Sequence, residues 1–389
     1  MDIKELARKQ KQYVIDLRRD FHKYPEASWQ EVRTSQKIKE ELDKMRIPYT
    51  SIAKTGVIAT ITGGNKGKTV ALRADMDALQ VHEKNDVAYS SQNFGIMHAC
   101  GHDGHTAMLL GAAKILNDVK DEINGTVKLI FQPAEEIAQG ARLMVEQGAL
   151  NGIDNIFAIH LWADLPTGTI SVQEGPRMAS ADIFKVIVKG KGGHGSLPHQ
   201  GVDAIVSASA IVMDIQSIVS REISPLESAV VSVGVFQSGT RFNVIASEAI
   251  LEGTTRCFNP EIRNEFPNIL ERVIRNTAAS YRAEATLEYT FGTPPTINDA
   301  ASAAIAQKSV EQLIGKDALI KMDKITGGED FALFVEKVPG AIAFVGVRNE
   351  AKKACYPHHH PMFSIDEDGL EIGTALYAQY AVDYLNKNN

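Results

Sequence analysis

Cysteine is scarce in this sequence, which has only Cys100, Cys257 and Cys355 among its 389 residues. So few cysteines argue against a disulfide framework and favour a reducing compartment. The sequence also lacks a run of about 20 apolar residues, the length that a membrane-spanning helix needs. Its N-terminus mixes charged and apolar residues and lacks the uninterrupted apolar core of a signal peptide. We therefore expect a cytoplasmic protein without a membrane partner.

An excess of positive charge is also missing. The 41 Lys and Arg residues against 48 Asp and Glu residues give a formal net charge of -7, which argues against nucleic acid as the main partner. The hydrophobic fraction of 44% and the charged fraction of 23% are those of a globular protein. A chain of 389 residues is too long for one ordinary core, so we expect two domains.

Apolar runs of strand length alternate with helical patterns in the first part of the chain. Helices are expected over residues 3–22, 30–45, 105–118 and 137–147, and buried strands over 69–74, 127–131 and 156–159. Strands that alternate with helices predict an α/β fold with parallel strands. Such sheets bind ligands beyond the carboxyl ends of their strands.

The pattern changes near residue 180. A strand, a glycine-dense turn and a helix are followed by two strands, a helix and a closing strand, and this order suggests an inserted α+β domain. The sequence therefore predicts one domain from residues 1–180 and 292–389, and a second domain from residues 181–291.

The segment from His98 to His105 is the densest group of potential metal ligands. Cys100 and His102 are separated by one glycine, so a tight loop could aim a thiolate and an imidazole at one transition metal ion. The alternative is a buried free cysteine beside a structural histidine. His98 and His105 are expected to be structural or to support a ligand.

Acidic residues and a histidine follow three of the predicted strands. Asp75 and Asp77 are either turn residues or supports for a ligand histidine. Glu135 and Glu136 could begin a helix, where acidic residues are favourable, or one could bind metal while the other takes a proton from water. His160 is a core residue or a ligand, and its place after an apolar strand favours the ligand.

Candidates outside this group are less distinctive. His194 lies in the glycine-dense turn, and the alternative there is an ordinary surface loop. Asn243 and Arg256 suit the recognition of a carboxylate or carbonyl, although single Asn and Arg residues are usually solvated. The spacing of His358, His359 and His360 does not say which of the three points inward.

Seven motifs together resemble the metal-dependent aminoacylase, hippurate hydrolase and indoleacetyl-amino acid hydrolase family, a group of amidohydrolases related to carboxypeptidase G. The motifs run from Arg73 to Leu79, His98 to Asp103, Gln132 to Glu136, Lys191 to Gly195, Phe242 to Ile245, Glu252 to Arg256 and Gly328 to Phe331. They occur in the family's order, and the resemblance covers nearly the whole chain. It implies a zinc-peptidase-like catalytic domain with an inserted lid and dimerisation domain.

The resemblance also implies a dinuclear metal site with Cys100 between the two ions. The other ligands would be His102, Glu136, His160 and His359, the last chosen from its distance to Pro361, with His360 as second choice. Mn²⁺ or Zn²⁺ is expected, and this set of donors would also accept Co²⁺ or Ni²⁺.

Roles for the remaining candidates follow from the same resemblance. Glu135 would be the general base, and Asp77 would orient a ligand. His194 would polarise the substrate carbonyl, within its own chain or across a homodimer, while Asn243 and Arg256 would hold the polar end of the substrate.

The sequence therefore predicts an amidohydrolase that cleaves N-acyl amino acids. A dipeptidase or carboxypeptidase on the same dinuclear scaffold is the first alternative, and a non-catalytic binding protein is the second. The presence of Glu135 argues against the second, because binding alone needs no base.

Overall fold

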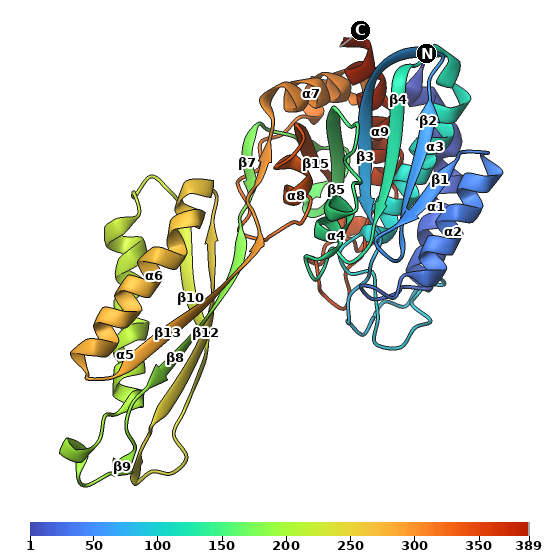
Figure 1. The fold of residues 1–389 in the computed structure, drawn as a ribbon. Coiled ribbons are helices and arrows are strands. Elements are labelled where there is room, and N and C mark those ends of the chain that lie inside the picture. The colour runs from blue at the N-terminus through green and yellow to red at the C-terminus, as the bar shows by residue number, and fades with distance from the viewer. Residues whose placement is uncertain (388–389) are drawn as a thin grey trace. The chain divides into compact units, whose positions relative to one another are not determined.

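The computed structural model describes residues 1–387, which form two compact units with separate apolar cores (Figure 1). Unit 1 comprises Met1–Gly175, Ile297–Asp323 and Asp330–Asn389, and unit 2 comprises Pro176–Thr296 and Lys324–Glu329. The chain leaves unit 1 along β7 (Gly175–Met178) and returns along β14 (Thr296–Asn298). The division expected from the sequence lies a few residues from these crossings and did not include the short second segment of unit 2.

Unit 1 contains a seven-stranded sheet in the order β1-β2-β4-β3-β5-β15-β6. Its strands are β1 (Tyr49–Ile52), β2 (Gly56–Thr62), β3 (Asn65–Asp75), β4 (Asn124–Gln132), β5 (Asn155–Pro166), β6 (Ile170–Ser171) and β15 (Gly340–Arg348). The four central strands, β4, β3, β5 and β15, are parallel, and the outer strands pair antiparallel. The predicted α/β fold with parallel strands is confirmed.

Helices of unit 1 pack against this sheet and against one another. They are α1 (Ile3–Lys23), α2 (Val32–Lys44), α3 (His102–Asp118), α4 (Gly140–Glu146), α7 (Ala300–Ile314), α8 (Ala332–Val335) and α9 (Asp368–Lys387). Helices α1, α3 and α9 contact one another, and α9 also contacts the four parallel strands. Tyr377 of α9 is fully buried and donates a hydrogen bond to the main-chain oxygen of Arg73 at 2.6 Å, which fixes α9 to β3.

Unit 2 is an antiparallel sheet in the order β10-β12-β8-β13 with two helices on it. The elements are β8 (Ala181–Lys189), α5 (Ala204–Asp214), β10 (Ala229–Ser238), β12 (Glu248–Cys257), α6 (Pro260–Ser280) and β13 (Glu284–Thr293). Alternate residues of β8, Phe184, Val186 and Val188, are buried in the core of the unit, as a sheet with one covered face requires. A separate pair of short strands is formed by β9 (Gly193–His194) and β11 (Val244–Ile245).

One helical segment of unit 2, Ala204–Glu222, has 19 residues and a mean hydropathy of 1.3, so by length and composition alone it could cross a membrane. The expectation that the chain lacks a stretch of this length and hydropathy was therefore wrong. Ala208, Ile211 and Ile215 on its inner side belong to the apolar core of unit 2. Core helices satisfy the same test, so the segment is weak support for a membrane partner.

The parallel strands bring the candidate residues of unit 1 to one edge of the sheet. Asp75 is the last residue of β3, and Gln132 is the last residue of β4. The expectation that His160 follows the end of a strand was wrong, because β5 continues to Pro166 along β15. The pairing of β3 with β5 nevertheless stops at Ala158, so His160 lies where β5 extends beyond its neighbour.

Candidate metal centre and active site

Two groups of potential ligands share the thiol of Cys100. One group is Cys100, His102 and His160, and the other is Cys100, Glu136 and His359; within each group the ligand atoms lie within 4.8 Å of one another. The Sγ atom of Cys100 is 3.7 Å from Nε2 of His160. The carboxylate of Glu136 lies 3.8 Å from Nε2 of His102 and 3.6 Å from Nε2 of His359. The structure thus brings the other four expected ligands together around the thiol of Cys100.

The geometry distinguishes the three consecutive histidines near the C-terminus. His359 has a left-handed backbone with φ of 65°, and its N–H donates to the oxygen of Ala99 at 2.8 Å, which turns it toward the Cys100 segment. Nε2 of His358 instead accepts from the N–H of Ala163, and the ring of His360 stacks on Tyr356. His359 is therefore the member of the trio that lies with the other ligands.

Asp77 fixes the orientation of His102. Nδ1 of His102 is 3.0 Å from the main-chain oxygen of Asp77 and 3.3 Å from its Oδ1. The other carboxylate oxygen of Asp77 accepts from Ser28 Oγ at 2.6 Å and from the N–H of Glu136 at 3.1 Å. Nε2 of His102 is thereby left to face the ligand cluster, as a carboxylate behind a ligand histidine commonly arranges.

Asp75 supports a different histidine. It lies 2.6 Å from Nδ1 of His105, whose Nε2 accepts from the N–H of Leu161 in β5. Arg73 donates to the same carboxylate at 2.7 Å. His105 is therefore held between β3 and β5 and has a supporting place, as the sequence analysis expected of it.

Burial and the neighbouring carboxylates shift the pKa values of the ligand side chains in this cluster. Burial raises the pKa of the Cys100 thiol well above its usual value. Burial, with the nearby charges of Asp77 and Asp75, also raises the pKa of Glu136 to about 7 against the opposing effect of His102. Burial would lower the pKa of His102, but the charge of Asp75 and the hydrogen bond to Asp77 raise it. A divalent cation bound here would lower the pKa of the thiol and of the carboxylate, because it favours their ionised forms.

Two buried atoms of the expected ligands lack hydrogen-bond partners within residues 1–387, as atoms that bind a metal ion would. Among the described residues, Nε2 of His102 and Oε1 of Glu136 are buried and have no hydrogen-bond partner. Buried polar atoms are nearly always satisfied, so each such atom requires an explanation. A thiolate, imidazoles and carboxylates are ligands that Zn²⁺ and similar transition metals accept. These residues therefore fit a metal centre.

A second buried network lies behind the cluster and was not found from the sequence. Asp103, next to His102, forms an ion pair with Arg18 at 2.8 Å and contacts His22 at 2.7 Å, and His22 in turn contacts Glu83 at 3.0 Å. Arg18 and Asp103 are fully buried. The only signal in the sequence was an arginine on an amphipathic helix, where this residue is usually solvated.

The three remaining candidates lie in unit 2, at two ends of its sheet. His194 is exposed in β9, pairs with Val244, and its Nδ1 lies 2.9 Å from Ser196 Oγ. The exposed Asn243 accepts from the N–H of Gly195 at 2.9 Å, so it is close to His194. Arg256 is near the far end of β12, about 26 Å along the strand from Glu248. Within one chain, His194 and Asn243 therefore do not share a small-molecule site with Arg256.

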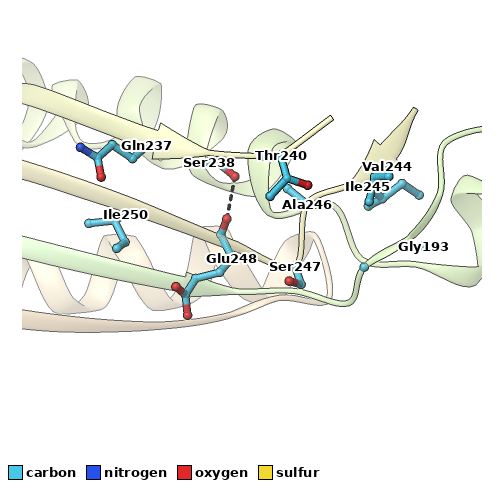
Figure 2. Close-up of a pocket in the computed structure, with 12 residues that line it drawn as sticks. Gly193, Gln237, Ser238, Thr240, Val244, Ile245, Ala246, Ser247, Glu248 and Ile250 are labelled. Atoms are coloured by element: carbon cyan, nitrogen blue, oxygen red, sulfur yellow. Dashed lines mark hydrogen bonds between the residues drawn. The ribbon is translucent and has the colours of Figure 1, made fainter. Parts of the chain in front are cut away.

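Each end of this sheet has a pocket. Figure 2 shows a pocket of about 610 Å³ beside β9 and β11, lined by residues that include Gly193, Val244 and Ile245. In it, Ser238 Oγ donates to the main-chain oxygen of Glu248 at 2.6 Å. A pocket of about 190 Å³ at the other end includes Arg256 in its lining. Arg256 thus lines a pocket, whereas the pocket beside β9 includes Gly193, the neighbour of His194, but not His194 itself.

Comparison with known proteins gives a consistent result. Residues 71–383 match the model of Peptidase family M20/M25/M40. The chain is 43% identical over 371 residues to the N-acetylcysteine deacetylase of Bacillus subtilis, covering 95% of this chain and 96% of that protein. It is 38% identical over 390 residues to thermostable carboxypeptidase 1 of Saccharolobus solfataricus, covering 99% and 98%.

A solved structure is also closely similar. The Bacillus subtilis YXEP protein, a dinuclear metal binding peptidase from the M20 family, superimposes with a TM-score of 0.87 at 39% identity. The superposition covers 97% of this chain and 99% of that protein. The likeness therefore extends over both units.

Proposed function

The chain belongs to Peptidase family M20/M25/M40, and from this membership we propose that it is a metal-dependent amidohydrolase of N-acyl-L-amino acids. The products would be a carboxylate, such as acetate or benzoate, and a free amino acid. The observation that carries the proposal is the cluster in which Cys100 is shared by two groups of ligands, with Glu135 close to one member of each group. The deacetylase at 43% identity supports the acyl substrate.

The residues proposed to hold two divalent cations are Cys100, His102, Glu136, His160 and His359. When bound, the ions supply positive charge that polarises the amide carbonyl and makes a water molecule more acidic. Mn²⁺ and Zn²⁺ are the proposed metals, and Co²⁺ and Ni²⁺ suit the same ligands. Asp77 keeps His102 in the ligand orientation through the contacts at its Nδ1.

Glu135 is the proposed general base. Its carboxylate lies within 4.8 Å of ligand atoms of His102 and Glu136, and it is only partly buried. From this place it can take a proton from the attacking water and then deliver it to the leaving amine nitrogen. One carboxylate thereby serves both proton transfers of amide hydrolysis.

The substrate contacts proposed for unit 2 require two copies of the chain. His194 would stabilise the developing oxyanion, while Asn243 and Arg256 would hold the amino acid end of the substrate. Since β12 separates His194 and Asn243 from Arg256 within one chain, we propose a homodimer that combines Arg256 of one copy with the other two from its partner.

A dipeptidase or carboxypeptidase is the second candidate function. It is favoured by the 38% identity to a thermostable carboxypeptidase over nearly all of both chains. The two activities share the metals and the base and differ in the group attached to the amide nitrogen or carbonyl.

The low cysteine content supports the further proposal of a cytoplasmic location.

The test of the function is amine release from N-acetyl and N-benzoyl amino acids and from dipeptides. The protein would be stripped with a chelator and assayed with and without added Mn²⁺ or Zn²⁺. Metal-restored cleavage of acyl amino acids is the expected result. Cleavage of dipeptides alone would favour the second candidate, and absence of cleavage by protein with bound metal would contradict both.

A further inference from the structure

The loop that carries Glu135 and Glu136 has an unusual backbone. It connects the end of β4 at Gln132 to the start of α4 at Gly140, and the helix begins three residues later than the sequence pattern predicts. Ala134 and Ala138 have φ values of 52° and 54°, in the left-handed region that alanine rarely adopts. Such a conformation persists only where surrounding structure enforces it.

Asp330 holds both ends of this loop. Both of its carboxylate oxygens lie 2.8 Å from Nε2 of Gln132, the residue before the loop. Its Oδ2 also accepts from the N–H of Ala141, just after the loop, at 3.0 Å. One fully buried carboxylate therefore joins the two ends of the segment that presents the proposed base.

The main chain of Asp330 contacts the base itself. Its N–H points to Oε1 of Glu135 at 3.4 Å, a long hydrogen bond to a carboxylate. Asp330 thus acts on the loop with its side chain and on the Glu135 carboxylate with its backbone.

Arg73 supplies the charge that keeps this carboxylate buried. It is 1% exposed and donates to Asp330 at 3.0 Å, to Asp75 at 2.7 Å and to Gln132 Oε1 at 2.7 Å. A buried carboxylate without a counter-charge would be strongly destabilising. Arg73 therefore allows Asp330 to be ionised where it holds the loop.

We propose that Asp330 is a positioning residue for Glu135, which it holds at the place needed for proton transfer. This inference rests on the proposed function, in which Glu135 is the base. Misplacing a catalytic group by about 1 Å can lower a rate about 100-fold. Asp330 does not contact the substrate and acts only through the loop and Glu135.

The test is Asp330→Asn, which preserves the size of the side chain. Gln132, Ala141 and Arg73 all donate to the carboxylate of Asp330, so an amide NH₂ in its place would face another donor. We expect kcat to fall about 100-fold, while KM stays within about threefold and the bound metal is unchanged. Glu41→Gln is the matched control, because Glu41 is a buried carboxylate in α2 that contacts Tyr13 and Lys44, and it should leave kcat unchanged.

Hydrogen exchange of the loop amides is the second measurement. A general loss of stability would speed exchange throughout unit 1, whereas loss of the positioning role should speed it in the loop alone. Amides of residues 134–141 should exchange faster in D330N than in the wild type, with β3 and α9 unchanged. Normal kcat, or a fall in kcat that accompanies loss of metal, would overturn the proposal. If D330N does not fold, Gln132→Glu decides, because it keeps the acceptor for Arg73 and removes the donor to Asp330; a normal kcat in that variant would overturn the inference.

Failure of this inference can be distinguished from failure of the proposed function. If Glu135→Gln retains activity, the assignment of the base is wrong, whatever D330N does. If Glu135→Gln is inactive and D330N has normal kcat and normal loop exchange, only the role of Asp330 is wrong.

Discussion

The candidate residues of unit 1 and those of unit 2 differ in how they are held. In unit 1, His102, Asp77 and Glu136 are buried or nearly so, and Asp77 connects the other two, since it lies 3.3 Å from Nδ1 of His102 and accepts from the N–H of Glu136 at 3.1 Å. In unit 2, His194 and Asn243 are exposed, and so are Ser196 and Gly195, with which they make hydrogen bonds. A preorganised site can be interpreted within one chain, whereas exposed functional candidates acquire a clear role only when a substrate or a second copy contacts them.

The largest effect is expected in the buried site of unit 1. Glu135→Gln removes the base but keeps the shape of the side chain, so kcat should fall at least about 1,000-fold. Metal content, measured by elemental analysis, should not change, because Glu135 is not among the proposed ligands. A variant with near-normal turnover would contradict the proposed role.

The next largest effect is expected at an exposed candidate residue of unit 2. His194→Ala should lower kcat about 100-fold or more, as loss of an oxyanion donor does. Equal amounts of Glu135→Gln and His194→Ala chains, unfolded and refolded together, should recover about a quarter of the wild-type activity if His194 acts across a homodimer. About half of the dimers are then mixed, and each has one intact site.

The matched control for this mixture is each variant refolded alone, which should stay inactive. Recovery only in the mixture would place His194 in the partner's site. No recovery, with dimers shown by light scattering, would instead place His194 and Glu135 in the same copy.

A smaller effect is expected from the residue that orients a ligand. Asp77→Ala should weaken metal binding about 10- to 100-fold, because Nδ1 of His102 loses the carboxylate of Asp77 and keeps only the main-chain oxygen of residue 77. Ser28→Ala is the control, since it removes a hydrogen bond to Asp77 and keeps the carboxylate. Competition with a chelator of known affinity would measure both variants, and equal affinities for D77A and the wild type would argue against the orienting role.

The smallest effect concerns an exposed ion-pair group of unit 1. Hydrogen bonds from Lys11 and Lys352 lower the pKa of Asp368 to about 2. Because the folded pKa is below the unfolded value of about 3.9, this stabilisation is present above about pH 4 and is lost as the pH falls toward 2. Lys352→Met, which also removes the ion pair with Asp366 at 2.6 Å, should lower the free energy of unfolding by about 1 kcal/mol at pH 7, since the lysine is half-exposed.

Urea denaturation at pH 7 and near pH 2 would measure this difference. The exposed Lys66 of β3 provides a matched Lys→Met control. An effect of Lys352→Met that persists undiminished at the lower pH would show that the charges of Asp366 and Asp368 are not its cause.

Much of this architecture could be predicted from the sequence because its signals are local. Apolar runs identified the buried strands at 69–74 and 127–131, and these lie within β3 and β4. The ligand candidates could be named because Cys100 and His102 belong to one short motif. The extent of β5 could not be predicted, since its continuation past His160 depends on pairing with β15, far away in the sequence.

The supporting residues were harder to find for the same physical reason. Arg73 and Asp330 make their contacts over long sequence separations, and no spacing rule connects them. Arg18 shares the charged pattern of an ordinary surface helix, although it is fully buried beside Asp103. Choosing among His358, His359 and His360 required the backbone of the loop, which the spacing of three consecutive histidines does not fix.

The insertion of unit 2 between parts of unit 1 has a consequence for the order of folding. The sheet of unit 2 needs no residue beyond Thr293, whereas β15 of unit 1, at Gly340–Arg348, lies between β5 and β6. During synthesis from the N-terminus, the inserted sheet can therefore be complete while one edge of β5 is still unpaired. We expect unit 2 to fold first and unit 1 to be the slower unit, with an exposed strand edge that invites aggregation until β15 arrives.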